Sequence, residues 1–89
     1  MRAVEVCHRA AGLVGGGRAR QHGEAIASHT KIAALWSAYL NSPITAHDVA
    51  LMMVLLKIAR TKVGVFNLDD YVDAAGYAAI AAEVAGCDA

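Results

Sequence analysis

The sequence predicts a small all-α bundle of three to four helices. Apolar residues recur at steps of three and four along several segments, which is the spacing of one helix face. Alanine, the strongest helix former, supplies 20 of the 89 residues. No segment alternates apolar and polar residues for long enough to indicate a strand. We therefore expect a single all-α domain over residues 1–89, with an N-terminal helix (1–14), a Gly/Arg loop (15–24) and a three-helix core (25–85).

The composition limits the classes of partner. Formal net charge is zero, so nothing indicates a binding surface for a nucleic-acid polymer or an anionic membrane. A core built largely from alanine is small, and for that reason we expect self-association into a homo-oligomer. The most apolar run, Val49 to Leu56, is too short to span a bilayer, and the N-terminal residues do not resemble a signal peptide. A cytoplasmic protein is expected, with Cys7 and Cys87 as free thiols in preference to a disulfide.

The first helix is predicted over Ala3 to Val14. Its inward-facing residues are expected to be Val4 and Ala11, with Val6, Ala10 and Leu13 as further candidates. The glycine triplet that begins at Gly15 stops it, because consecutive glycines lose too much backbone entropy in a helix.

The loop GGGRARQHGE carries Arg18, Arg20 and His22. A glycine-rich loop with arginines before a helix can present backbone amides and guanidinium groups to a phosphate. It is not a P-loop, because the Lys-Ser/Thr ending is absent. A flexible hinge with solvated arginines is the alternative interpretation.

A second helix is predicted over Ala25 to Leu40, where apolar residues form one stripe. Trp36, the largest residue on it, is expected to be a core anchor rather than a ligand-stacking residue. His29 lies on the same stripe, where either a hydrogen-bonded interior histidine or a ligand-binding one is possible.

A third helix is predicted over Ala46 to Lys62, after the only proline. Thr45 is expected to be the N-cap, with Asp48 in a capping box. The apolar surface of this helix is wide enough for the central helix of a bundle. Lys57 and Arg60 are three residues apart and so share a face.

A fourth helix is predicted over Leu68 to Ala85, with Asn67 as its cap. Asp69 and Asp70 in its first turn complement the macrodipole. Asp70 shares a face with two later residues, Asp73 and Tyr77. Gly76 is expected at a point where two helices approach closely.

Two interpretations remain open for the charged residues of the last two helices. In one, basic and acidic groups pair across the seam and set the register of the helices. In the other, Lys57 and Arg60 bind phosphate oxygens while carboxylates orient them or hold a divalent cation. The two are compatible, because oriented cations are good phosphate ligands. Metal-dependent hydrolysis needs several convergent carboxylates, and no Glu-x-x-Glu pair is present. The sequence thus leans against catalysis.

These residues give the chain a family resemblance. Arg18, His22-Gly23, IAALWSAYL (Ile32 to Leu40), DVALMMVLLKIAR (Asp48 to Arg60) and DYVDAAGY (Asp70 to Tyr77) resemble the signature of a family of small bacteriophage and prophage proteins of mostly unassigned function. The resemblance covers about 70 residues, from the glycine-rich loop to Glu83.

More distantly, the K-x-x-R and D-x-x-D-x-x-x-Y motifs are similar to phage nucleotide-modification-associated domains and to MazG-like all-α nucleotide pyrophosphohydrolases. This similarity implies a nucleotide ligand, magnesium and oligomerisation. MazG-like enzymes carry a paired acidic motif on the first bundle helix, whereas Ala25 to Leu40 contains no acidic residue. The chain also has Gly17 where the family tends to have an acidic residue, and His29 where an amide is usual.

The sequence therefore supports three hypotheses. The first is a phage-type protein that binds a nucleotide or nucleotide-derived phosphate ligand without turnover and without a cofactor, which a phage could use to sequester a host defence signal. Its ligand-binding residues would be Arg18, Arg20, His22, Lys57, Arg60, Asp73 and Tyr77. The second is a MazG-like pyrophosphohydrolase with magnesium on Asp69, Asp70 and Asp73. The third is a structural or protein-interaction module.

Overall fold

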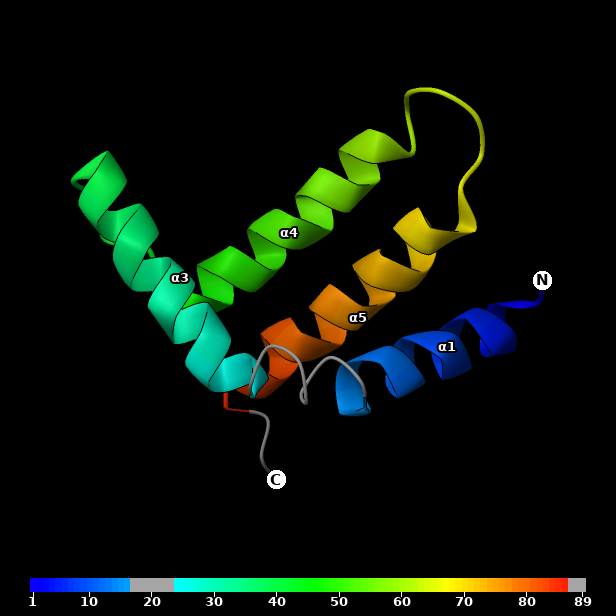
Figure 1. The fold of residues 1–89 in the computed structure, drawn as a ribbon, viewed down its shortest axis with the longest axis horizontal. Coiled ribbons are helices and arrows are strands. Elements are labelled where there is room, and N and C mark those ends of the chain that lie inside the picture. The colour runs from blue at the N-terminus through cyan, green and yellow to red at the C-terminus, as the bar shows by residue number, and fades with distance from the viewer. Residues whose placement is uncertain (17–23, 87–89) are drawn as a thin grey trace.

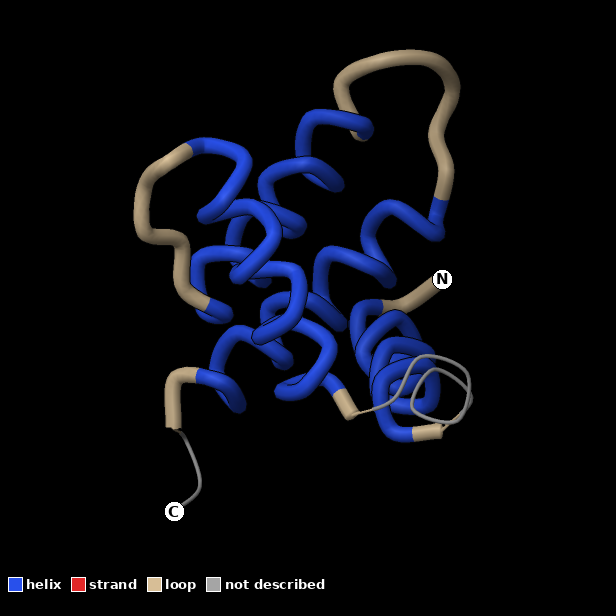
Figure 2. The backbone as a smooth tube through the Cα atoms, turned by 60° about the vertical axis from the view of Figure 1, so that its left-hand side comes forward, coloured by secondary structure: helices blue, strands red, loops and turns tan. Residues whose placement is uncertain are grey.

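The computed structural model describes residues 1–16 and 24–86, and it contains four α-helices there. They are α1 (Ala3–Gly15), α3 (Ala25–Leu40), α4 (Ala46–Arg60) and α5 (Leu68–Val84). The described residues contain no strand (Figure 2). The predicted all-α fold is confirmed, and the predicted helix ends agree with the observed ones to within two residues.

The helices α4, α5 and α1 lie side by side, with α5 between the other two (Figure 1). The helix α3 crosses α4 and α5 at the end opposite the turn that joins them, and it forms a V with α4 (Figure 1). The prediction that the third predicted helix, α4, is central is therefore wrong. α5 contacts all three other helices and buries Val72, Gly76, Ile80 and Ala81. Small side chains on several sides of α5 let the other helices approach it, whereas α4 packs mainly against α5 and α3.

Local sequence signals explain where α4 and α5 begin. The backbone N–H of Asp48 donates to Oγ1 of Thr45 at 3.0 Å, and the N–H of Thr45 donates to Oδ2 of Asp48 at 3.0 Å, so the predicted capping box is confirmed. Oδ1 of Asn67 accepts from the N–H of Asp69 at 3.0 Å, which confirms the second cap.

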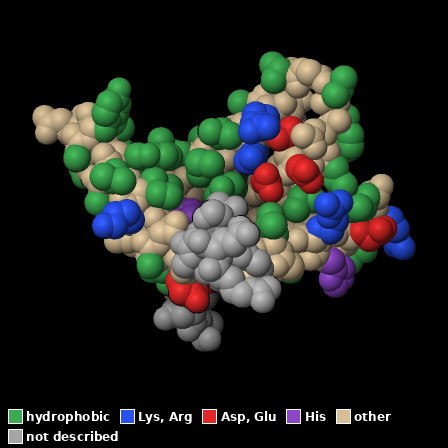
Figure 3. Space-filling view, viewed as in Figure 1, with side chains coloured by type: hydrophobic (Ala, Val, Ile, Leu, Met, Phe, Trp, Pro, Cys, Tyr) green, Lys and Arg blue, Asp and Glu red, His purple; other side chains and the backbone are tan. Residues whose placement is uncertain are grey.

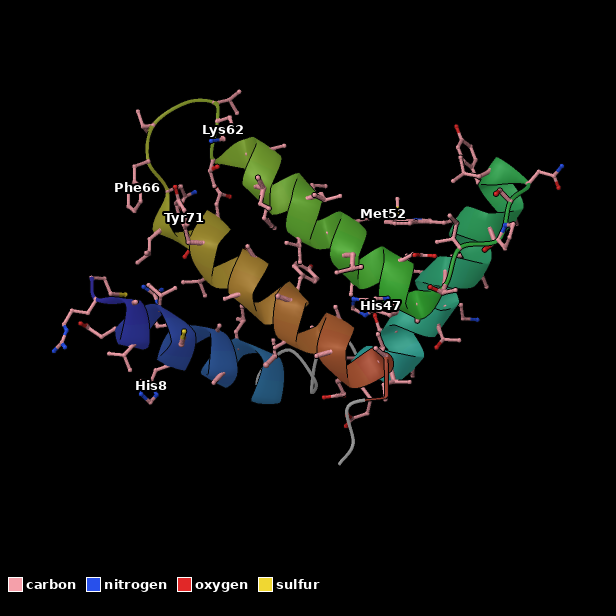
Figure 4. All side chains as sticks on the ribbon, turned by 180° about the vertical axis from the view of Figure 1, so that it is seen from behind. His8, His47, Met52, Lys62, Phe66 and Tyr71 are labelled. Carbon is pink, nitrogen blue, oxygen red and sulfur yellow. The ribbon has the colours of Figure 1, made fainter. Side chains whose placement is uncertain are left out.

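An aromatic pair at the turn between α4 and α5 reinforces the second cap. The ring of Phe66 stacks on that of Tyr71, with ring centroids 5.6 Å apart. Figure 4 shows the two side chains next to each other at the start of α5. Phe66 directly precedes the cap residue Asn67, and Tyr71 is the fourth residue of the helix. This is the arrangement of a hydrophobic staple, which fixes the direction in which the chain enters a helix.

Two expectations about buried residues need correction. On α1, Ala10 is the buried residue, while Val4 and Ala11 are exposed. Val6 and Val14 are half-buried on the same side as Ala10, so the inward face is the one with these three residues and not the one with Val4 and Ala11. Trp36 is half-buried rather than a core anchor, because α3 diverges from α4 toward its C-terminal end (Figure 1).

Gly76 packs closely against α1, as predicted. A Cβ atom built on Gly76 would lie 3.1 Å from Cγ1 of Val14, which is tighter than ordinary van der Waals contact. Glycine at this position therefore allows α1 and α5 to approach each other.

Candidate functional site: the ion pairs between α4 and α5

Two ion pairs join α4 to α5. Nζ of Lys57 lies 3.1 Å from Oδ2 of Asp73, and Nε of Arg60 lies 3.4 Å from Oδ1 of Asp70. The two cations are three residues apart on α4, and the two carboxylates are three residues apart on α5. Because the two helices are antiparallel, this equal spacing places each cation opposite one carboxylate. Figure 3 shows basic and acidic side chains close together on one face of the molecule. The structure therefore brings together the four charged residues that the sequence singled out here.

The two pairs differ in exposure. The side chain of Lys57 is 13% exposed and that of Asp73 is 27% exposed, so this pair is largely shielded. The side chain of Arg60 is 57% exposed, whereas that of its partner Asp70 is only 9% exposed. The buried carboxylate of Asp70 thus contacts an arginine, Arg60, whose side chain is accessible to solvent.

The helix ends favour this arrangement of charge. Asp70 lies in the first turn of α5, where the positive end of the helix dipole stabilises a carboxylate. Arg60 lies in the last turn of α4, where the negative end stabilises a cation. The contact uses Nε, one of three guanidinium nitrogens, and an arginine carries five N–H donors in total. Arg60 is therefore suited to hold an anion in addition to its carboxylate partner.

Asp69 faces another part of the molecule. Its Oδ1 lies 3.8 Å from Nη2 of Arg9 on α1, and both side chains are more than half exposed, so the pair adds little stability. The three aspartates of α5 proposed for magnesium thus each lie beside a different cation. Within residues 1–16 and 24–86, no three His, Cys, Asp or Glu side chains are grouped as a metal site would require.

His29 and Tyr77 meet next to these pairs. Their ring centroids are 6.2 Å apart, with the ring planes tilted by 56°. His29 is buried, and its Nδ1 donates to the carbonyl oxygen of Ala25 at 2.9 Å. Its Nε2 has no hydrogen-bond partner among the described residues. The interior interpretation of His29 is therefore confirmed, with one nitrogen unsatisfied.

A shallow hollow beside Tyr77 lies between α5 and α1. Asp73, Gly76 and Tyr77 line it from α5, and Leu13 and Val14 line it from α1. The predicted ligand-binding residues Asp73 and Tyr77 thus border the same depression, one helical turn apart.

Some predicted residues cannot be placed in this site, and some observed contacts were not predicted. Arg18, Arg20 and His22 lie outside the described residues, as does Cys87; Cys7 is an exposed free thiol. The pair Arg9–Asp69 joins helices that are distant in sequence, and no local pattern indicates it. The contact between His29 and Tyr77 likewise depends on how α3 crosses α5.

Comparison with known proteins agrees with the sequence signature. Residues 5–85 match the model of a family described as a domain of unknown function (DUF6378). The Gene 55 protein of Mycobacterium phage L5 is 45% identical over 69 residues, which are 76% of this chain and 44% of that protein. The Gene 55 protein of Mycobacterium phage D29 is 41% identical over 66 residues, 74% of this chain and 44% of that protein. The chain thus spans about half the length of these relatives. No solved structure is significantly similar to it. In the described residues, no helix is long and apolar enough to span a membrane.

Proposed function

We propose, from the premise that the chain belongs to the DUF6378 family of small phage proteins, that it binds a nucleotide or nucleotide-derived phosphate ligand without turnover. The observation that carries this proposal is the contact between Arg60 and Asp70. A mostly buried carboxylate contacts an arginine whose side chain remains 57% exposed. Charge-assisted hydrogen bonds from a guanidinium group to phosphate oxygens are strong and geometrically specific.

The neighbouring residues take supporting parts. Lys57 adds positive charge one turn along α4, and Asp73 fixes the position of its ammonium group. Tyr77 borders the hollow beside Asp73, where its ring can contact the sugar or base of the ligand. Arg18, Arg20 and His22 would contribute phosphate contacts from the loop that precedes α3.

Binding without chemistry suits a protein that sequesters a signal. A phage protein that binds a nucleotide made by a host defence system lowers the concentration of that nucleotide without needing a catalytic base or a metal. The proposal requires only an oriented cation and a contact for the rest of the ligand. The aspartates of α5, each paired with a cation, are arranged to position Lys57, Arg60 and Arg9.

A thermal-shift screen against mono-, di- and cyclic nucleotides, with and without magnesium, tests the proposal. A ligand at 100 times its dissociation constant adds about 2.7 kcal/mol to the free energy of unfolding. For a domain of this size that corresponds to a rise of about 10 °C or more in Tm. Calorimetric titration would then give the affinity, and chromatography of the recovered ligand would show whether it is intact.

Two outcomes would contradict the proposal. If no nucleotide shifts the Tm of protein whose circular dichroism shows it to be folded, the chain does not bind this class of ligand. If magnesium-dependent release of phosphate or pyrophosphate is found, the chain is a hydrolase rather than a binder.

A further inference from the structure

The outward face of α4, the side turned away from α5, consists of exposed apolar residues. Leu51, Leu55 and Ile58 follow one another at steps of four and three, and their exposed fractions are 42%, 63% and 46%. Met52 lies beside them and is 39% exposed. The opposite side of the helix carries the buried Val49 and Ala50. Thus α4 is apolar on both sides, although the single chain covers only one.

This face opens into the angle between α3 and α4. Figure 4 shows Met52 directed from α4 toward that angle, and Figure 3 shows hydrophobic side chains along its inner side. On α3, Leu35 and Tyr39 are also exposed, at 63% and 88%. An apolar helix face is normally buried in a soluble protein. The outward face of α4 therefore needs a partner.

The surface area of the whole chain is larger than that of a compact monomer. The chain exposes 6133 Å². A compact monomer of its mass, 9.3 kDa, exposes about 5,000 Å². The excess of about 1,100 Å² is of the order that one partner buries in a standard-size interface, about 800 Å². The radius of gyration of 13.6 Å likewise exceeds the value of about 12 Å expected for 89 residues.

We propose that a second copy of this chain covers the outward face of α4, which makes the protein a homodimer. Leu51, Leu55 and Ile58 carry no charge or hydrogen-bonding group that would select a partner of complementary polarity, but they are complementary to themselves. In a two-fold dimer the same patch meets itself, so each leucine finds an apolar neighbour. Because the formal net charge of the chain is zero, no overall electrostatic repulsion opposes this association. Two V-shaped α3–α4 pairs that interlock in this way form a four-helix contact.

Light scattering during size-exclusion chromatography tests the proposal, at a protein concentration of about 100 µM, well above the dissociation constant of an interface of standard size. The wild-type chain is expected to have twice the monomer mass of 9.3 kDa. Leu55→Glu places a charge in the middle of the patch and is expected to give a monomer. Val65→Glu is the matched control: Val65 is 90% exposed, but it lies in the turn before α5, and its variant should remain dimeric.

A second measurement keeps the test decisive if Leu55→Glu does not fold. The Tm of a wild-type homodimer rises with protein concentration, whereas that of a monomer does not change. A wild-type mass of 9.3 kDa with a constant Tm would overturn the proposal and leave the face for a different protein. A dimeric Leu55→Glu variant, or equal dissociation of the Val65→Glu control, would show that the interface lies elsewhere.

Discussion

Asp70 and Arg60 meet at 3.4 Å across the seam between α4 and α5, with the carboxylate 9% exposed and the guanidinium-bearing side chain 57% exposed. This asymmetry separates two contributions. The carboxylate belongs to the packed seam between the helices, while the cation reaches the surface. A purely structural ion pair does not require one partner to be accessible, and an anion-binding arginine does.

Arg60→Ala is expected to weaken binding of the phosphate ligand by about 1.5 to 3 kcal/mol, because a charge-assisted contact is lost. This corresponds to a 10- to 150-fold higher Kd, measured by calorimetric titration with the nucleotide found in the thermal-shift screen. Lys62→Ala removes an exposed cation two residues further on and should leave the Kd within twofold. If Arg60→Ala instead lowers Tm and leaves the Kd unchanged, Arg60 belongs to the scaffold alone.

Gly12→Ala and Gly76→Ala are expected to have different effects on stability. A Cβ at Gly12 meets nothing within 4 Å, so alanine should raise the free energy of unfolding by up to about 1 kcal/mol through its helix propensity. At Gly76 the new Cβ would lie 3.1 Å from Cγ1 of Val14, and moving α1 away offsets that gain. Chemical denaturation of both variants measures the difference. A gain at Gly76 as large as that at Gly12 would show that α1 is not held tightly against α5.

His29→Leu is expected to leave the free energy of unfolding unchanged or to raise it by about 1 kcal/mol, because it removes a buried nitrogen that lacks a partner among the described residues. His29→Ala should instead lower it by about 2 kcal/mol, since it leaves a cavity beside Tyr77. Urea denaturation distinguishes the two. An equal loss in both variants would mean that the imidazole contributes hydrogen bonds that leucine cannot replace.

Features set by neighbouring residues in the sequence were predictable. The caps at Thr45 and Asn67 and the close contact at Gly76 follow from residue types at fixed offsets within one segment. The four residues of the two seam ion pairs were also identified, because equal spacing on two consecutive helices allows them to pair. The pairing itself was one of two compatible interpretations, and ligand binding by Arg60 stays a prediction.

Features that depend on how the helices assemble were not predictable. Both α4 and α5 are apolar enough to be central, and only their packing shows that α1 lies against α5. The half-buried position of Trp36 follows from the divergence of α3 from α4, which no periodicity indicates. The apolar outward face of α4 explains the error about the central helix: its width is a property of the sequence, but the single chain does not cover it.

The capping box of α4 is expected to make stability depend on pH. The pKa of Asp48 is held below its ordinary value of 3.8, first by the backbone N–H of Thr45 and then by the hydroxyl group of that residue. A carboxyl group whose pKa is lower in the folded protein stabilises the fold above the ordinary pKa and loses this contribution as pH falls through the folded value. Wild-type Tm should therefore fall more steeply below pH 4 than that of Asp48→Asn, with the two profiles parallel at higher pH. Thr45→Ala should lower stability by about 1 kcal/mol at neutral pH, while Thr45→Ser keeps the cap. Identical acid profiles for the wild type and Asp48→Asn would show that this carboxylate adds nothing to the start of the helix.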